Sequence, residues 1–268
     1  MAAKVSGSVL VTGANRGIGL EVVRQLSESP CPPTHIFAGC RDPHGPGAKA
    51  LRELAQKHPQ KITTLRLDQT DQATISEAAR QVGSALKGAG LNLLINNAGI
   101  NQAANSNTVP VGNLAHTGEK EMTEVFLTNT VGPMIVTKEF LPYLRQAASL
   151  PGVSPSEMSC RRAAVVNVST LFSSIQRCHE LFLQAPMYPY RVSKAALNML
   201  TRCLSEDLKS DGILVMALHP GWVQTDMGGP QAPLSTEDSV RGMLSVISSL
   251  SEQHVGSLLD WEGRSIPW

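Results

Sequence analysis

The sequence predicts an α/β protein: a doubly wound, mainly parallel sheet of seven strands in a single domain spanning residues 1–268. Short runs of aliphatic and β-branched residues alternate with longer helical patterns along the whole chain, which is typical of strand–helix–strand units. Several runs, such as Leu-Asn-Leu-Leu-Ile at 91–95, are apolar nearly throughout, as expected of a parallel strand that helices cover on both faces. The strands are expected at 5–12, 35–40, 61–67, 91–96, 163–170, 213–219 and 255–260. The helices are expected near 18–29, 47–58, 71–86, 119–148, 190–209 and 236–250.

Composition narrows the class of protein. Hydrophobic residues make up 42% of the 268 residues and charged residues 17%, so a large packed core is expected and disorder is not. The formal net charge of +1 gives no reason to expect nucleic acid or a membrane surface as a partner. The five cysteines are an odd number without a Cys-x-x-Cys pair, so neither a disulfide framework nor a metal site is expected. Because no apolar run is long enough for a signal peptide or a membrane span, we expect a cytoplasmic protein.

A glycine-rich turn follows the first predicted strand and opens the first predicted helix. It reads Thr-Gly-Ala-Asn-Arg-Gly-Ile-Gly at 12–19. Glycine permits the unusual dihedral angles of such a turn and lets a pyrophosphate approach bare backbone, while the helix start directs free N–H groups at the phosphate. The position at the first strand predicts a Rossmann-type dinucleotide site. Its candidate phosphate-binding residues are Gly13, Asn15, Arg16, Gly17, Ile18 and Gly19.

The end of the second strand indicates which nicotinamide cofactor is bound. An NAD site usually has a carboxylate there, roughly 20 residues after the glycines, to bind the ribose 2′-hydroxyl. Cys40 occupies this position and Arg41 follows it, with Arg16 as a second positive charge in the glycine turn. A guanidinium in place of a carboxylate favours a 2′-phosphate, so we expect NADP(H). Asp42 leaves NAD open as the alternative, should the strand end later than expected.

A tyrosine and a lysine four residues apart, Tyr190 and Lys194, open the fifth predicted helix. This spacing places the phenol and the ammonium on one helical face. An ammonium about 5 Å from the phenol, at an effective dielectric near 20, stabilises phenolate by roughly 3 kcal/mol. That energy corresponds to a pKa lowered by about two units, which would make Tyr190 a usable acid or base near neutral pH.

Other polar motifs lie where parallel strands end, at the edge of the sheet where this architecture binds its ligand. Asn-Asn-Ala-Gly at 96–99 closes the fourth strand, Asn129 lies on the following helix, and Asn-Val-Ser-Thr at 167–170 ends the fifth strand. The loops around 101–118 and 171–187 follow strands directly, so they are expected to shape a substrate pocket.

With these motifs in order, the chain resembles the classical short-chain dehydrogenases/reductases from about Val5 to its C-terminus. Within that family it is most similar to carbonyl reductases of the C-factor and sniffer type. The similar segments are Tyr-Pro-Tyr-Arg-Val-Ser-Lys-Ala-Ala-Leu-Asn at 188–198, His-Pro-Gly-Trp-Val-Gln-Thr-Asp-Met-Gly-Gly at 219–229 and the closing Ile-Pro-Trp.

The resemblance implies a role for each matching residue. Tyr190 would donate the proton to a carbonyl oxygen, Lys194 would also hold the nicotinamide ribose, and Asn129 would support a water that carries protons. The remaining cofactor-binding residues implied in this way are Asp68 at the adenine, Asn97 beside the ribose with Ala98 and Gly99 next to it in the chain, and Pro220, Gly221, Val223 and Thr225 at the carboxamide.

One position departs from the family's pattern. The substrate-orienting serine is the second of a Ser-Ser pair in the family, and here the pair reads Ser169-Thr170. In that register Thr170 takes the role, its hydroxyl still able to donate to a carbonyl oxygen. Ser169 should point to the other side of the strand, although it stays the alternative.

The function expected from these observations is NADPH-dependent reduction of a small-molecule carbonyl compound, an aldehyde, ketone or quinone, to an alcohol. An NADP(H)-binding regulatory protein with little or no turnover is the alternative, to which Thr170 and the long 171–187 loop point. A sugar-nucleotide epimerase or dehydratase is disfavoured, because few residues follow Gly229 to form a substrate region. In many relatives the helices that carry Asn129 and Tyr190 form a dimer interface, so the resemblance allows a homodimer, which the sequence does not decide.

Overall fold

The computed structural model describes residues 5–101, 112–150, 157–183 and 185–268. Within these ranges seven strands form one sheet in the order β3-β2-β1-β4-β5-β6-β7, and every neighbouring pair is parallel. The strands are β1 (Ser8–Thr12), β2 (His35–Cys40), β3 (Ile62–Arg66), β4 (Leu93–Asn96), β5 (Ala164–Val168), β6 (Leu214–His219) and β7 (Leu258–Asp260). The predicted fold class is confirmed, and the sheet is wholly rather than mainly parallel.

The strand order reverses between β1 and β4, because β2 and β3 extend the sheet to one side and β4 to β7 extend it to the other. In an open parallel sheet such a reversal leaves a crevice at the carboxyl ends of the two central strands, and ligands bind there. The glycine turn follows β1 and the Asn-Asn-Ala-Gly motif follows β4. The topology therefore brings these two motifs to the same crevice.

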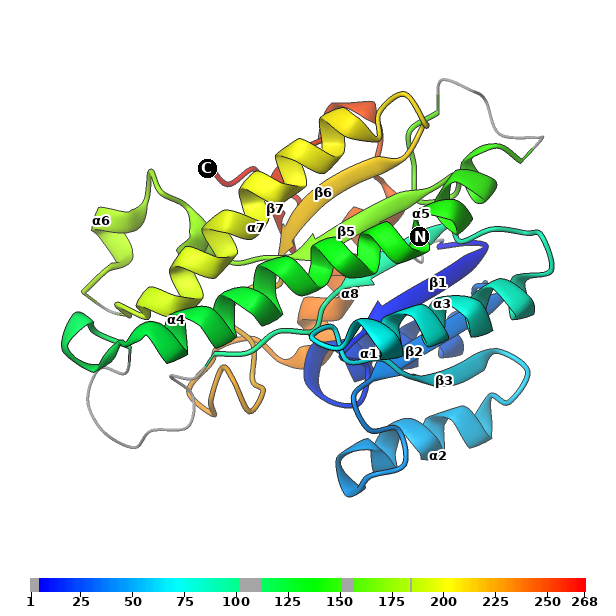
Figure 1. Cartoon of the computed structure of the whole chain (residues 1–268), viewed down its shortest axis with the longest axis horizontal. Coiled ribbons are helices and arrows are strands. Elements are labelled where there is room, and N and C mark those ends of the chain that lie inside the picture. Colours follow the sequence, from blue (N-terminus) through cyan, green and yellow to red (C-terminus); the bar gives the residue numbers. More distant parts are fainter. Residues whose placement is uncertain (1–4, 102–111, 151–156, 184) are drawn as a thin grey trace.

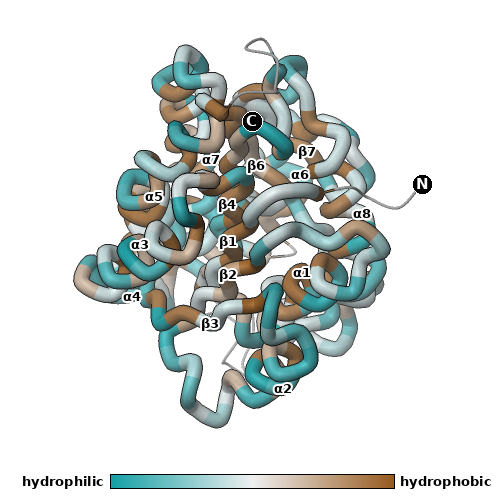
Figure 2. Tube along the Cα trace, turned by 90° about the vertical axis from the view of Figure 1, so that its right-hand side faces the viewer, coloured by the Kyte–Doolittle hydropathy of each residue, from teal (hydrophilic) through white to brown (hydrophobic). Residues whose placement is uncertain are grey.

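Helices cover both faces of the sheet (Figure 1). The helices are α1 (Gly17–Glu28), α2 (Lys49–Lys57), α3 (Gln72–Leu86), α4 (Glu119–Phe126), α5 (Gly132–Ala148), α6 (Cys178–Leu181), α7 (Tyr188–Asp207) and α8 (Thr236–Ser248). Side chains of α1, α2 and α8 pack in one hydrophobic core cluster, and those of α3, α5 and α7 pack in a second cluster on the other face. Figure 2 shows the strands as a largely hydrophobic layer between these two groups of helices. The continuous apolar runs of the sequence are explained by this double cover.

The predicted helix at 119–148 is divided into three parts. A π-helical turn, Leu127–Val131, separates α4 from α5. Pro133 supplies a physical reason, because proline has no N–H with which to return an α-helical hydrogen bond to the carbonyl of Asn129. Such widened turns are frequent at functional sites, and this one carries Asn129.

The stretch at 171–187 was expected to be an irregular loop, and its described part is more regular than that. It contains a 3₁₀ turn at Leu171–Ser173 and the short helix α6, and α7 begins at Tyr188, two residues before the predicted start. Residues 102–111 of the predicted substrate loop 101–118, and residue 184, lie outside the described residues. Among the helices of the described residues, none has the length and apolar character needed to cross a bilayer.

Candidate active site

The glycine turn between β1 and α1 has the geometry of a bare-backbone cradle. Gly13 and Gly17 have φ angles of 66° and 54°, in the left-handed region that favours glycine. A Cβ on Gly13 would lie 2.9 Å from the Cα of Ala98, and one on Gly19 would lie 2.3 Å from the carbonyl oxygen of Gly13. No side chain caps the start of α1, so its first N–H groups remain available to a ligand.

Thr12, at the end of β1, joins the glycine turn to the turn after β4. Its hydroxyl oxygen accepts hydrogen bonds from the backbone N–H groups of Asn97 (3.1 Å) and Ala98 (3.0 Å). The Asn97 side chain returns a hydrogen bond to the Thr12 carbonyl at 2.9 Å. The two predicted cofactor-binding turns are therefore one rigid unit. The sequence analysis missed Thr12, whose signal would have been a polar residue at the end of an otherwise apolar strand.

Tyr190 and Lys194 lie on the first turns of α7, as predicted, and face the ends of β4 and β5. The Lys194 ammonium donates to the Val168 carbonyl at 2.7 Å and lies 6.0 Å from the centre of the Tyr190 ring. A Cβ on Gly99 would be 3.6 Å from the Lys194 nitrogen and 3.2 Å from the Asn129 side-chain oxygen. Four predicted site residues from three separate segments, namely Tyr190, Lys194, Gly99 and Asn129, therefore meet in one place.

The electrostatics of this pair differ from the expected lowering of the phenol pKa. Burial raises the pKa of Tyr190 to about 12, although a side-chain hydrogen bond with Thr170 acts in the opposite direction. Burial lowers the pKa of Lys194 to about 8. The expectation assumed that the lysine charge dominates, whereas burial is the largest cause of the pKa shift at both groups. Tyr190 is thus fully protonated near neutral pH, in the state of a proton donor.

Asn129 is fully buried and its side chain is occupied by protein groups. Its amide nitrogen donates to the Ile100 carbonyl (2.9 Å) and to the Ser193 hydroxyl (3.1 Å), and its amide oxygen accepts from the Ile100 N–H (2.9 Å). Asn129 thereby fixes the chain after β4 against α7. Ser193, within the Tyr-x-x-x-Lys motif, is a second residue that the sequence analysis missed.

The two hydroxyls of the Ser169-Thr170 pair have different partners. Ser169 donates to the Asn198 side chain at 2.7 Å, and Asn198 in turn donates to the Ser173 hydroxyl at 2.8 Å. Thr170 instead interacts with Tyr190 and accepts a 3.3 Å hydrogen bond from the N–H of Phe172. The geometry therefore places the Thr170 hydroxyl, rather than that of Ser169, beside the Tyr190 phenol.

The segment after β6 lies against the glycine turn. Gly221 has a φ angle of 86°, and the Pro220 carbonyl accepts a 2.6 Å hydrogen bond from the Ser239 hydroxyl. A Cβ on Gly17 would lie 3.4 Å from the Thr225 methyl group, so this segment borders the phosphate cradle. Val223 continues the segment through a bridge to Leu234.

At the end of β2 the charged residues are exposed. Arg41 and Asp42 both face solvent, and one Asp42 oxygen accepts hydrogen bonds from the N–H groups of His44 (3.1 Å) and Gly45 (2.9 Å). The β2 strand ends at Cys40, as predicted. Arg16, the second expected positive charge, forms an exposed ion pair with Asp226 rather than standing alone.

Asp68 and Gln69 follow β3, the edge strand that lies next to β2. Asp68 accepts hydrogen bonds from the N–H and the hydroxyl of Thr70 at 2.9 and 2.7 Å. Gln69, which the sequence analysis missed, is buried and donates to the carbonyls of Ala98 (3.1 Å) and Thr128 (2.7 Å). It therefore ties this strand end to the residues around the active site.

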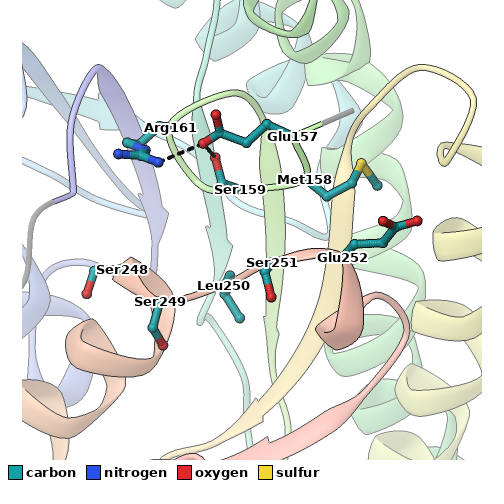
Figure 3. Close-up of a pocket in the computed structure, with 9 residues that line it drawn as sticks. All are labelled: Glu157, Met158, Ser159, Arg161, Ser248, Ser249, Leu250, Ser251 and Glu252. Carbon is teal, nitrogen blue, oxygen red and sulfur yellow. Dashed lines mark hydrogen bonds and ion pairs between the residues drawn. The ribbon is translucent and has the colours of Figure 1, made fainter. Parts of the chain in front are cut away.

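A separate hollow of about 420 Å³ lies at the opposite end of the sheet (Figure 3). It is bordered by residues that precede β5 and residues that follow α8, including Glu157, Arg161 and Ser251. Those residues are at the amino ends of the strands, so this hollow is not part of the candidate active site. No cluster of three or more potential metal ligands occurs among the described residues.

Comparisons with known proteins identify the family of this chain. Residues 7–233 match the family model for short chain dehydrogenases. The chain belongs to the short-chain dehydrogenase/reductase family. This short-chain dehydrogenase is an oxidoreductase, and the family predicted from the sequence is confirmed.

Three relatives illustrate the match. An NADPH-bound carbonyl reductase from chicken fatty liver is 48% identical, with a TM-score of 0.89 over 97% of this chain and 94% of the other. The carbonyl reductase Sniffer of Drosophila melanogaster is 37% identical, with a TM-score of 0.88 over 97% and 99% of the two chains. The C-signal protein of Myxococcus xanthus is 40% identical over 178 residues, which are 66% of this chain and 93% of that protein.

Proposed function

We propose that this dehydrogenase uses NADPH to reduce aldehydes, ketones or quinones to alcohols, with Tyr190 as the proton donor. The observation that carries the proposal is the cluster of Tyr190, Lys194 and Thr170 beside the glycine turn. Tyr190 holds a proton at neutral pH, and Thr170 interacts with the same phenol. A carbonyl oxygen placed between these two hydroxyls would receive a hydrogen bond from each.

Lys194 supports a nicotinamide site in particular. An ammonium has three N–H donors, and one of them goes to the Val168 carbonyl. The described residues give this buried lysine no carboxylate partner. Two donors are therefore available to the ribose hydroxyls of a bound cofactor. With the bare backbone at Gly13 and Gly19 and the uncapped start of α1, the residues present fit a dinucleotide.

The preference for NADPH over NADH is supported by the residues after β2. Asp42, the residue that would bind an unphosphorylated ribose, has one oxygen occupied by the turn at His44 and Gly45. Arg41 is exposed and adjacent to the strand end, where a 2′-phosphate would lie. The NADPH-bound chicken relative, at 48% identity, agrees with this assignment.

When bound, the reduced nicotinamide supplies a hydride to the carbonyl carbon. The residues of the chain orient the two reactants and supply the proton. Tyr190 transfers its phenolic proton to the carbonyl oxygen, whose developing negative charge the Thr170 hydroxyl stabilises. The Lys194 ammonium lowers the energy of the phenolate left behind, since it is a cation within the same buried site.

Reprotonation of Tyr190 needs a route from solvent, and we assign its support to Asn129. The Asn129 side chain holds Ile100 and Ser193, so the group left for a water is its main-chain carbonyl. Pro133 occupies the position of that carbonyl's α-helical donor and has no N–H to give.

We further propose a homodimer built on α4, α5 and α7. Large apolar side chains are exposed on these helices, with Met199 65% exposed, and Phe126, Met134 and Val192 share this character. A homodimer would bury these exposed apolar side chains in its interface. A Met199→Lys variant should then lower the mass measured by sedimentation from that of two chains to that of one.

A cytoplasmic location stays a prediction.

Turnover of purified protein with NADPH and with NADH, over a panel of aldehydes, ketones and quinones, tests the function. NADPH consumption with one or more of these classes, and much weaker consumption of NADH, is the expected result. Tight NADPH binding without turnover on any class would favour the regulatory alternative. A preference for NADH would overturn the assignment of Arg41.

A further inference from the structure

The segment at 171–187 lies between two residues of the candidate active site. It begins after Thr170 and ends shortly before Tyr190, and its described parts are 171–183 and 185–187. Figure 1 shows α6, within this segment, beside the N-terminal end of α7. The conformation of the segment therefore determines what borders the reacting phenol on this side.

The side chain of Arg191, next to Tyr190, holds three separate points of this segment. Its Nη1 donates to the Phe172 carbonyl at 3.3 Å, its Nη2 to the Leu181 carbonyl at 2.8 Å, and its Nε to the Ala185 carbonyl at 2.8 Å. A guanidinium has five N–H donors in a rigid planar fork, so a single side chain can bind all three carbonyls at once. The beginning, middle and end of the segment are thereby tied to the catalytic helix.

The surroundings of Arg191 are unusual for an arginine. The residue is 7% exposed, and its guanidinium lies 4.7 Å from the centre of the Phe172 ring and 5.9 Å from that of Phe182. The described residues give it no carboxylate partner, so carbonyl dipoles and aromatic faces compensate its charge. Burial accordingly lowers the pKa of Arg191. Burying a guanidinium costs free energy. All the hydrogen bonds and ring contacts given above for this guanidinium are with residues of the one segment, 171–187.

The segment that Arg191 holds presents apolar side chains. Ile175 is 75% exposed and Leu183 is 90% exposed. The N–H of Gln176 also donates to the carbonyl of Trp268 at 3.0 Å, which attaches the segment to the backbone of Trp268. A fixed wall with these side chains would contact a large apolar substrate and leave a small one untouched.

We propose that Arg191 is a positioning residue that fixes residues 171–183 and 185–187 as an apolar wall of the substrate pocket and so sets selectivity for bulky carbonyl compounds over small ones. This proposal rests on the proposed reductase function. Arg191 acts through the segment and does not touch the reacting atoms.

Arg191→Met and Arg191→Lys test this role, with Arg202→Met as the matched control. Arg202 lies on the same helix, and its contacts are with the Gly256 carbonyl and with Glu206, away from the segment. For each variant kcat and KM are measured with a polycyclic ortho-quinone and with a small aliphatic diketone. NADPH affinity and hydrogen exchange of the backbone at 171–187 are measured in parallel.

We expect Arg191→Met to raise KM for the quinone about tenfold. Without Arg191 the wall is ordered only when the substrate binds, and the entropy lost in ordering it reduces the free energy of binding. The kcat for both substrates, KM for the diketone and the NADPH affinity should stay within about threefold of wild type. Hydrogen exchange in the segment should accelerate. For KM and for hydrogen exchange, Arg191→Lys should lie between wild type and Arg191→Met, since an ammonium cannot reach all three carbonyls. Arg202→Met should match wild type in both.

An equal loss of kcat with both substrates would show that Arg191 serves the catalytic centre itself, and it would overturn the proposal. Unchanged KM values in both Arg191 variants would overturn it as well. If one variant fails to fold, the other supplies the test. Should wild type turn over no member of the carbonyl panel, the reductase function fails, and unchanged hydrogen exchange in the Arg191 variants would then separately overturn the positioning role of Arg191.

Discussion

The candidate active site at β5 and α7 and the predicted cofactor-binding edge after β2 are built in opposite ways. At the centre, Lys194 and Asn129 are buried, and each has hydrogen-bond partners from other segments. At the edge, Arg41 and Asp42 are exposed, and Asp42 binds only the turn that follows it.

The difference indicates how each region tolerates change. Charges in a buried site are screened weakly. Removing one group therefore alters the pKa values of its neighbours and the free energy of unfolding of the protein. The charge of an exposed guanidinium is screened by water and dissolved ions. Its contribution to the free energy of ligand binding is therefore small and additive. Large effects that depend little on salt are therefore expected at the centre, and smaller, salt-dependent effects are expected at the edge.

The largest effect should come from Tyr190→Phe. Loss of the phenolic hydroxyl removes the proton donor, and kcat with the best carbonyl substrate should fall by about 10³-fold. The ring keeps its packing, so NADPH affinity should stay within about threefold of wild type. Steady-state kinetics and calorimetry measure the two quantities. A variant that keeps a tenth or more of wild-type kcat would show that the proton comes from elsewhere.

A pH effect on stability should follow from the buried lysine. The pKa of Lys194 is lowered from 10.5 to about 8 in the folded protein, so between these values the unfolded chain binds more protons. The free energy of unfolding without cofactor should therefore rise with pH across this window, by on the order of 3 kcal/mol at most. Urea unfolding of wild type and Lys194→Met at several pH values measures the difference.

Lys194→Met lacks the titrating group and is the control. The contribution of Tyr190 has the opposite sign, since its raised pKa makes stability fall above pH 10, so the comparison is kept below that value. An identical pH dependence in both proteins would contradict the assigned burial of the lysine charge.

Substitutions of the two hydroxyl residues at the end of β5 should affect different quantities, catalysis for Thr170 and stability for Ser169. Thr170→Val keeps the shape and removes the hydroxyl, and kcat/KM should fall about 30-fold, whereas Thr170→Ser should stay near wild type. Ser169→Ala breaks the contact with Asn198 and should lower the free energy of unfolding by about 1–2 kcal/mol. Its kcat/KM should change less than that of Thr170→Val. The reverse pattern would assign the substrate to Ser169.

The smallest effect is expected at the exposed edge. Arg41→Ala should weaken NADPH binding about tenfold, with no change for NADH, and the loss should shrink as salt is added. Asp42→Asn is the matched control, and its NADPH and NADH affinities should both stay near wild type because the side chain serves the turn. Weaker NADH binding in Asp42→Asn would show that this carboxylate reads the ribose.

Several elements of the site could be placed from local sequence alone. The strand ends at Thr12 and Asn96 were close to the predicted ones, since uninterrupted apolar runs stop there. Tyr190 and Lys194 were predicted to share a helical face because a separation of four residues is a property of the helix itself. The division of 119–148 at the π turn was missed, although Pro133 was a signal for it.

The amino-acid sequence by itself determined the order of strands and helices, the glycine turn and the spacing of the reacting pair, because these depend on residues near one another in the chain. Only the tertiary structure decided that Tyr190 is hard to ionise, that Ser169 and Thr170 have different partners, and that Arg191 is buried. Burial and hydrogen-bond partners come from segments distant in sequence, and a pKa or a contact cannot be assigned until those segments have been brought together.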